Sequence, residues 1–236
     1  MRILGHRGAS GSAPENTLAA FKMAFEMGVD GLEFDVQQTK DGELVVFHDW
    51  TLERTSNGKG NLKDFTLAEL KKLDAGSWFS EKFKGEKIPT LKEVMDIIPE
   101  DKFINIELKE ENSVENRGTE KTLVNFLKDY KHIDIVVSSF SHNLLKNIKE
   151  LDSTIKIGVL LESNLIDVNR YLDSMEFEIF SYHPGKSFLN KEQVKKVKSS
   201  GKMVNVWTVN FIEDGEKVRD MGVDSIITNY PERFIK

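Results

Sequence analysis

The 236-residue sequence contains no cysteine, so disulfide bonds and thiolate metal sites are both excluded. Long apolar runs are missing as well. No segment approaches the apolar length needed to cross a membrane, and the first residues form no apolar stretch of signal-peptide length. From these absences we expect a protein without a membrane span and with a cytoplasmic location.

An excess of positive charge is also absent. Lysine and arginine together number 33, against 39 aspartates and glutamates, which gives a formal net charge of −6, and no long basic run occurs. This balance argues against a nucleic-acid partner. Hydrophobic residues make up 39% of the chain, enough for a sizeable core, and no low-complexity linker divides it. We therefore expect one domain over residues 1–236.

What the sequence does contain is a regular alternation of short β-branched runs and amphipathic helical stretches. Roughly eight βα units on this length predict a TIM (β/α)8 barrel. A doubly wound open sheet is the alternative, but it usually has fewer units, and no glycine-rich phosphate-binding motif follows the first strand. The predicted strands are residues 3–4, 29–37, 103–108, 133–138, 155–160, 177–181, 203–207 and 225–228, and the predicted helices are residues 14–27, 119–130, 142–151, 165–172, 191–199 and 212–221.

A hairpin is predicted after the second strand, where Asp41-Gly42 separates two runs of strand-forming residues. A two-residue turn at this position pairs Lys40 with Glu43 and places His48 opposite Asp35. Directly paired side chains lie about 5 Å apart at Cβ, so these two would share a site. A turn one residue longer would change the pairing.

Residues 49–89 then interrupt the alternation. They contain a glycine-rich turn, a short helical pattern at residues 67–73 and an aromatic cluster of Trp78, Phe79 and Phe83. An insertion after the second strand lies at the C-terminal mouth of a barrel, where active sites form. We interpret this small insertion as a lid or wall of the pocket.

Acidic residues lie at the ends of two predicted strands. Glu33 and Asp35 are two residues apart, so both side chains point to the same face, and Glu107 ends the next barrel strand. Buried carboxylates are costly unless a cation or hydrogen bonds satisfy them. Three carboxylates without cysteine favour Mg²⁺ or Ca²⁺ over zinc. The alternative is a purely structural ion network with Arg7 and Lys109.

Two histidines are predicted at the same mouth. His6 follows the first strand directly, and His48 arrives through the hairpin. Such a pair is suited to acid–base catalysis on a phosphate ester, with one ring deprotonating the attacking oxygen and the other protonating the leaving oxygen. His48 is favoured as the acid and His6 as the base or nucleophile, and the order stays open. Arg7 and Lys109 suit an anionic phosphoryl transition state.

Further strand-end residues are candidates for contacting a substrate. Trp207 ends the predicted strand at 203–207, and Phe140 follows the strand at 133–138. Either ring could pack on an apolar or polyol part of a substrate, or belong to the core. His183, after the strand at 177–181, could line the pocket or brace a loop. Asn16 could cap a helix or support the metal site.

In these residues the chain resembles the glycerophosphodiester phosphodiesterase family. The resemblance runs from the first predicted strand to the last predicted helix, and the ordered set is specific although single pieces such as Asp41-Gly42 are weak. The matching segments are His6-Arg7-Gly8, Pro14-Glu15-Asn16-Thr17, Glu33-Phe34-Asp35, Asp41-Gly42, His48-Asp49, Thr51-Leu52-Glu53-Arg54-Thr55, Glu107-Leu108-Lys109, Trp207-Thr208-Val209-Asn210 and Gly222-Val223-Asp224 with Thr228 and Pro231.

The resemblance implies a TIM barrel with a small insertion after the second strand. It also implies hydrolysis of deacylated phospholipids, such as glycerophosphocholine or glycerophosphoethanolamine, to glycerol 3-phosphate and an alcohol. The insertion distinguishes this family from the related spider-venom-type phospholipases D and favours small, soluble diesters. The resemblance assigns metal ligation to Glu33, Asp35 and Glu107, catalysis to His6 and His48, phosphate contacts to Arg7 and Lys109, and substrate packing to Trp207.

Two other functions remain as alternatives. A lysophospholipase D acting on lipid-tailed diesters would need an exposed apolar rim, which Trp78, Phe79 and Phe83 could supply, although they could equally anchor the insertion. A non-catalytic phosphodiester-binding module is the other alternative. The pair of histidines argues against it, because binding alone needs no acid–base pair.

Overall fold

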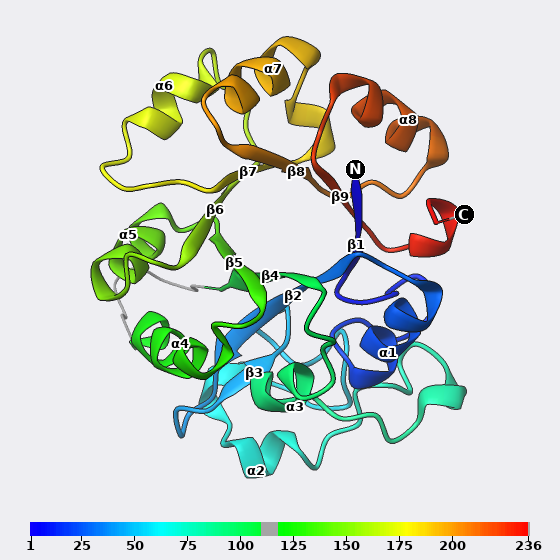
Figure 1. The fold of residues 1–236 in the computed structure, drawn as a ribbon. Helices are drawn as coiled ribbons and strands as arrows, with labels where there is room; N and C mark the ends of the chain where they lie inside the picture. The colour runs from blue at the N-terminus through cyan, green and yellow to red at the C-terminus, as the bar shows by residue number, and fades with distance from the viewer. Residues whose placement is uncertain (110–117, 236) are drawn as a thin grey trace.

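The computed structural model of the protein describes residues 1–109 and 118–235. Within them, eight parallel strands close into a barrel because β1 pairs with both β2 and β9 (Figure 1). A further strand, β3, pairs antiparallel with β2. The strands are β1 Arg2–His6, β2 Gly31–Gln38, β3 Leu44–Val46, β4 Phe103–Leu108, β5 Asp134–Ser139, β6 Lys156–Leu161, β7 Ser181–Pro184, β8 Met203–Val206 and β9 Ser225–Thr228.

Helices surround the barrel as an outer ring (Figure 1). The predicted TIM (β/α)8 barrel is therefore confirmed, and the open doubly wound sheet is excluded. Among the described residues, no helix combines the length and the apolar character that a membrane span requires. The α-helices are α1 Leu18–Met27, α2 Leu67–Leu70, α3 Leu91–Met95, α4 Thr119–Leu127, α5 His142–Leu151, α6 Val168–Asp173, α7 Lys191–Ser199 and α8 Ile212–Met221, and short 3₁₀ turns lie at 62–64, 81–83, 128–130, 186–188 and 231–233.

The main hydrophobic core lies between the barrel and its helices. In β2, Phe34 and Val36 are fully buried on the helix side, and the ring of Phe21 from α1 packs on Phe34 with centroids 5.5 Å apart. Successive strand residues alternate between the two faces, so Glu33 and Asp35 point the other way, into the barrel. Packing of the apolar face of β2 thus fixes the direction of its two acids.

The first predicted helix is shorter than the pattern suggested. Residues 14–27 were expected to be helical, but α1 begins at Leu18. Thr17 is its N-cap, because its hydroxyl accepts a hydrogen bond from the backbone N–H of Ala20. Asn16 before it has a φ of 57°, in the left-handed region, which keeps the preceding residues out of the helix. Residues 7–16 therefore form a loop at the mouth of the barrel.

The strand predicted at residues 177–181 lies further along the chain, as β7 at Ser181–Pro184. Its inward residues Ser181 and His183 are polar, and the strand contains no β-branched residue and ends in a proline, so the strand signal in the sequence is weak. The apolar residues Phe177 and Ile179 instead pack in the core before the strand begins. The prediction that His183 follows the strand is therefore wrong, since His183 lies within it.

The hairpin after β2 has a three-residue turn instead of the predicted two-residue turn. The backbone N–H of Thr39 donates to the Glu43 carbonyl at 2.9 Å, and the N–H of Gly42 donates to the Thr39 carbonyl at 3.1 Å. Gly42 has a φ of 90°, which is the left-handed conformation that closes such a turn. The pairing of the two strands is consequently shifted by one residue.

This shift changes the partner of Asp35. The backbone N–H of Phe47 donates to the Asp35 carbonyl at 3.0 Å, so Phe47 lies opposite Asp35. The predicted pairing of His48 with Asp35 is wrong. His48 lies beyond the end of β3 and reaches the mouth of the barrel from the segment that follows it.

Residues 49–89 share a second hydrophobic cluster with β3. The helical pattern predicted at 67–73 forms a shorter helix, α2, which begins at a capping box of Thr66 and Glu69. In Figure 1 this segment lies beside β3 and α3. The buried members of the cluster are Val45, Phe47, Leu52, Leu62, Leu70, Ala75 and Ile88.

The close contact of β2 with β4 predicts the effect of a substitution at Gly31. A Cβ added there would lie 1.8 Å from the Phe103 carbonyl oxygen, so Gly31→Ala must push the two strands apart. We expect a loss of about 3 kcal/mol or more in the free energy of unfolding, measured by urea denaturation. The control is Gly28→Ala, where φ is 87° but no atom lies within 4 Å, with an expected cost of about 1 kcal/mol. Equal costs for the two variants would contradict this account.

Candidate active site

Three neighbouring strands bring charged residues to one end of the barrel. His6 ends β1, Glu33 and Asp35 lie in β2, and Glu107 lies in β4. The register places His6 beside Glu33, and Asp35 beside Glu107. The carboxyl ends of parallel strands form the mouth of a TIM barrel. Strand direction and register are therefore sufficient to gather these side chains.

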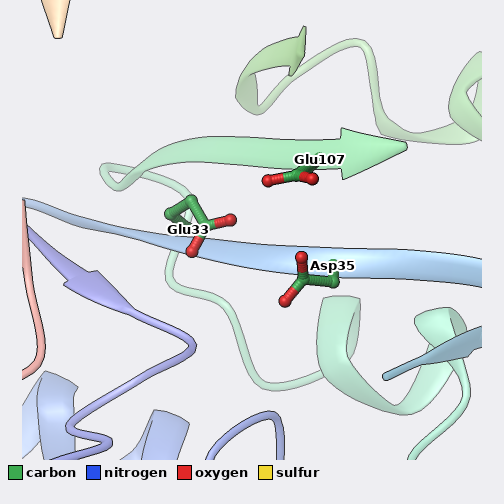
Figure 2. A group of neighbouring side chains, drawn as sticks. All are labelled: Glu33, Asp35 and Glu107. Atoms are coloured by element: carbon green, nitrogen blue, oxygen red, sulfur yellow. The ribbon is translucent and has the colours of Figure 1, made fainter. Parts of the chain in front are cut away.

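Glu33, Asp35 and Glu107 form a compact acidic cluster (Figure 2). One oxygen from each carboxylate lies within 4.8 Å of the others. Asp35 is fully buried, and Glu33 is 3% exposed. Carboxylates this close repel one another strongly when water does not screen them. The cluster could hold a single metal ion.

Two cationic side chains contact the cluster. Arg7 Nε lies 3.2 Å from Asp35 Oδ2, and Lys109 Nζ lies 2.8 Å from Glu107 Oε1 and 3.7 Å from Asp35 Oδ1. Glu33 Oε2 accepts a hydrogen bond from the backbone N–H of Arg7 at 3.3 Å and lies 3.8 Å from Nε2 of His6. Two of the three carboxylates therefore have cationic partners: Asp35 contacts Arg7 and Lys109, and Glu107 contacts Lys109. These are the contacts of the structural ion network that was the alternative to a metal site.

The shared burial of these acids changes their proton affinities. Burial, and then repulsion from Asp35 and Glu107, hold the pKa of Glu33 well above its usual range. Burial, with Asp35 next, raises the pKa of Glu107 to about 7. Burial alone would also raise the pKa of Asp35, but Arg7 and then His48 lower it. A bound cation would therefore compete with protons for Glu33 and Glu107.

His6 presents one ring nitrogen to the cluster. Its Nδ1 lies 2.5 Å from Asn229 Oδ1, an acceptor, so Nδ1 carries the proton and Nε2 faces Glu33. Burial, and then the charge of Arg7, lower the pKa of His6 to about 4. The ring is therefore neutral at neutral pH, with an unprotonated Nε2.

His48 is held by its neighbours in the chain. Its Nδ1 lies 2.6 Å from Asp49 Oδ1, so Nε2 is the nitrogen left for other contacts. The buried amide of Gln37 donates to the backbone carbonyls of Phe47, His48 and Asp49, at 2.9, 3.1 and 2.8 Å. This clamp holds the segment after β3 at the mouth of the barrel, although β3 itself ends at Val46.

Both histidines line one pocket of about 90 Å³. Its polar side carries the acids and cations from β1, β2 and β4, whereas apolar residues come from the other half of the barrel. The residues that line it are His6, Arg7, Glu33, His48, Asn105, Glu107, Lys109, Phe140, Leu160, Trp207, Thr208 and Ile227.

The candidate substrate-contacting residues separate into two groups. Phe140 and Trp207 line the pocket, and their rings meet edge to face with centroids 5.6 Å apart. His183 is fully buried inside the barrel, where its Nε2 lies 2.7 Å from Ser181 Oγ and 3.1 Å from Asn205 Nδ2. Its backbone carbonyl accepts a hydrogen bond from Trp207 Nε1 at 2.9 Å. His183 thus lies behind the pocket wall.

Two asparagines complete the site, and the sequence had assigned no role to Asn229 and two alternative roles to Asn16. Asn229, the partner of His6, directly follows β9, and a search of strand ends for polar residues would have found it. Asn16 was considered as a helix cap or a support for the metal site. Thr17 takes the cap, and Asn16 Nδ2 donates to Asp35 Oδ2 at 2.9 Å.

Known proteins share this architecture along the whole chain. A model of the Glycerophosphoryl diester phosphodiesterase family matches residues 6–233. A glycerophosphodiester phosphodiesterase of Caldanaerobacter subterraneus subsp. tengcongensis is 45% identical over 235 residues, covering 99% of this chain and 96% of that protein. Among solved structures, an Oleispira antarctica phosphodiesterase in complex with the product sn-glycerol-3-phosphate matches with a TM-score of 0.92 at 33% identity, covering 99% and 94% of the two chains. A Thermotoga maritima glycerophosphodiester phosphodiesterase matches with a TM-score of 0.82 at 33% identity, covering 100% and 97%.

The raised pKa of Glu107 predicts how stability depends on pH in the presence of a chelator. Its pKa is about 7 in the folded protein against an ordinary value of 4.5, so the folded state holds a proton that the unfolded chain releases. The contribution of Glu107 to the free energy of unfolding should fall by roughly 3 kcal/mol as pH rises from about 4.5 to 7. Urea denaturation at several pH values measures it. The buried histidines His6 and His183 act in the opposite direction, because their lowered pKa values make stability rise with pH. The contribution of Glu107 is therefore the difference between the wild-type and Glu107→Gln profiles, and a difference that stays constant from pH 4.5 to 7 would contradict the prediction.

Proposed function

Since this chain belongs to the glycerophosphoryl diester phosphodiesterase family, it is a phosphoric diester hydrolase, and we propose that it hydrolyses deacylated phospholipids. Glycerophosphocholine and glycerophosphoethanolamine are the expected substrates, and glycerol 3-phosphate and an alcohol the products. The observation that carries this proposal is the convergence of two imidazoles and an acidic cluster on one pocket. The product bound to the Oleispira antarctica relative, sn-glycerol-3-phosphate, supports it.

We expect Glu33, Asp35 and Glu107 to hold a divalent cation. The donor set fits, because all three side chains offer carboxylate oxygens, and within the described residues the buried Asp35 Oδ1 accepts no hydrogen bond. Oxygen donors of this kind suit Mg²⁺ or Ca²⁺. Such an ion, when bound, supplies Lewis-acid polarisation of the phosphoryl oxygens.

His6 is the expected base. Its ring is neutral and its Nε2 is unprotonated, so it can accept the proton of an attacking hydroxyl. The attacking group is the 2-hydroxyl of the glycerol unit, whose oxygen bonds to phosphorus while the bond from phosphorus to the alcohol oxygen breaks. The product of this step is a cyclic phosphate, which a water molecule then opens.

His48 is the expected acid. It gives a proton to the leaving alcohol oxygen in the first step and takes one from water in the second. In that second step the bond from phosphorus to the glycerol 2-oxygen breaks, and His6 returns its proton to this oxygen. Arg7 and Lys109 line the same pocket and can stabilise charge on the phosphoryl oxygens. Phe140 and Trp207 offer an apolar wall for the carbon part of the substrate.

A lysophospholipase D activity has less support. The residues considered for its apolar rim, Trp78, Phe79 and Phe83, pack edge to face on one another and are not among the residues that line the pocket. We propose instead that residues 49–89 form a wall beside the mouth, since the second hydrophobic cluster attaches this segment to β3. The cytoplasmic location stays a prediction.

The acid–base assignment predicts that each histidine is essential. His6→Ala and His48→Ala should each lower kcat on glycerophosphocholine by about 10² to 10⁴-fold, because a proton-transfer group is removed. Release of glycerol 3-phosphate measures the rate, and circular dichroism confirms folding. His132→Ala, an exposed histidine outside the pocket, is the matched control and should keep full activity. Turnover within threefold of wild type in either of the first two variants would refute the assignment of that residue.

The acidic cluster predicts dependence on a divalent ion. Treatment with a chelator should abolish release of glycerol 3-phosphate, and added Mg²⁺ or Ca²⁺ should restore it in the wild-type enzyme but not in Asp35→Asn. A comparison of glycerophosphocholine with lysophosphatidylcholine tests the substrate class. Activity that survives complete chelation would exclude the metal, and faster turnover of lysophosphatidylcholine would favour the lysophospholipase D alternative.

A further inference from the structure

A chain of alternating charges connects the loop after β1 with the segment after β3. Arg7 Nη1 donates to Glu15 Oε1 at 2.8 Å, and Glu15 in turn accepts from Arg54. Arg54 also donates to Asp49, whose Oδ1 lies 2.6 Å from Nδ1 of His48. The two ends of this chain, Arg7 and His48, both line the pocket, whereas its central residue, Arg54, is not among the lining residues.

Arg54 uses both edges of its guanidinium group. Nη1 and Nη2 donate to the two oxygens of Glu15, each at 2.8 Å. Nε and Nη2 donate to Oδ2 and Oδ1 of Asp49, at 2.5 and 2.9 Å. Paired contacts of this kind fix the plane of each carboxylate, which a lysine ammonium group cannot do.

This double contact restricts Asp49, and through it His48. Asp49 Oδ1 accepts from both Arg54 and the His48 ring, and its Oδ2 is held by Arg54, so the carboxylate cannot rotate without losing contacts. The backbone of the same segment is already held by Gln37. With the backbone held, only the orientation and the tautomer of the His48 ring can still vary. A fixed acceptor at Nδ1, the Asp49 carboxylate, determines both.

We propose that Arg54 is a positioning residue for the hydrolysis. It fixes Asp49 against Glu15, and thereby holds the His48 ring with Nε2 directed to the reacting phosphodiester. Because Glu15 lies on the loop that follows His6 and Arg7, the same contacts set the position of His48 relative to His6. The inference rests on the proposed role of His48. It gives a role to Glu15 and Arg54, which belong to the family-like segments at 14–17 and 51–55 but do not line the pocket.

The alternative is that Arg54 is an ordinary surface ion pair. Its side chain is 45% exposed, and exposed pairs contribute little to stability. A surface pair and a positioning residue differ in what their loss changes. The surface pair would leave kcat unchanged, whereas the positioning residue would lower kcat by acting through His48 alone.

Kinetics of Arg54→Gln and Arg54→Lys on glycerophosphocholine make the first test. We expect kcat to fall by about 10- to 100-fold in Arg54→Gln, as for losses of groups that orient catalytic side chains, with KM within about twofold of wild type. Arg54→Lys should recover only part of the loss, since it keeps the charge but not the two-edged geometry. Arg219→Gln, an exposed arginine on α8, is the matched control and should keep full activity. Wild-type kcat in Arg54→Gln would overturn the proposal.

A double-variant cycle shows whether Arg54 acts through His48. In the His48→Ala background, Arg54→Gln should change the residual rate by less than about twofold. If it still lowers the rate by the full factor, Arg54 acts elsewhere and the proposal is wrong. A His48→Ala enzyme with normal turnover is a different outcome, because it would refute the proposed function of His48 itself.

The His48 ring can also be observed directly by nuclear magnetic resonance of protein with ¹⁵N-labelled histidine. At a pH where the ring is neutral, the wild-type enzyme should show His48 with its proton on Nδ1, and Arg54→Gln should show a mixture of the two tautomers. His48→Ala identifies the resonances. An unchanged tautomer in Arg54→Gln would overturn the proposal even if the residual rate of His48→Ala is too low to measure. If Arg54→Gln does not fold, Arg54→Lys gives the same readout.

Discussion

Repulsion among three closely spaced carboxylates is the constraint on which the site depends. Oxygens of Glu33, Asp35 and Glu107 lie within 4.8 Å of one another, and because Glu33 and Asp35 are buried and Glu107 is largely so, water screens their charges poorly. Arg7 and Lys109 offset part of this cost through contacts with Asp35 and Glu107. Burial, and then repulsion from the neighbouring acids, still raise the pKa values of Glu33 and Glu107, and a divalent cation would offset this cost.

The backbone next to this cluster adopts unfavourable conformations that allow side chains to contact Asp35. Among the residues described, the non-glycine residues with a left-handed φ are Arg7, at 56°, and Asn16, at 57°. Such conformations cost about 1 kcal/mol or more for a residue with a side chain. Both side chains reach Asp35, so the contacts with its carboxylate compensate for the backbone cost. Contacts of Arg7 and Asn16 with Asp35 thus fix the conformation of the loop after β1. In this conformation Glu15 accepts hydrogen bonds from Arg54.

Prediction from sequence succeeded where an element has its own apolar pattern. The strands at 103–108 and 225–228 and the helix at 191–199 have the predicted ends, because each has apolar residues of its own in the core, such as Ile104 and Ile106, Ile226, and Val194 and Val197. It failed at β7, whose residues Ser181–Pro184 include no β-branched residue and end in a proline. It also failed by one residue in the hairpin, because Asp41-Gly42 is compatible with both a two-residue and a three-residue turn.

The sequence by itself determined the barrel, the strand ends that carry His6 and the three acids, and the kind of chemistry that these residue types support. These features follow from local periodicity and from the rule that parallel strands end at one mouth. Only the tertiary structure decided that His48 arrives from beyond β3, that Asn229 orients His6, that His183 lies behind the pocket, and that Glu15 and Arg54 join two segments of the mouth. The physical reason is that these contacts join residues far apart in the chain, whose distances depend on turn geometry and packing and leave no periodic pattern in the sequence.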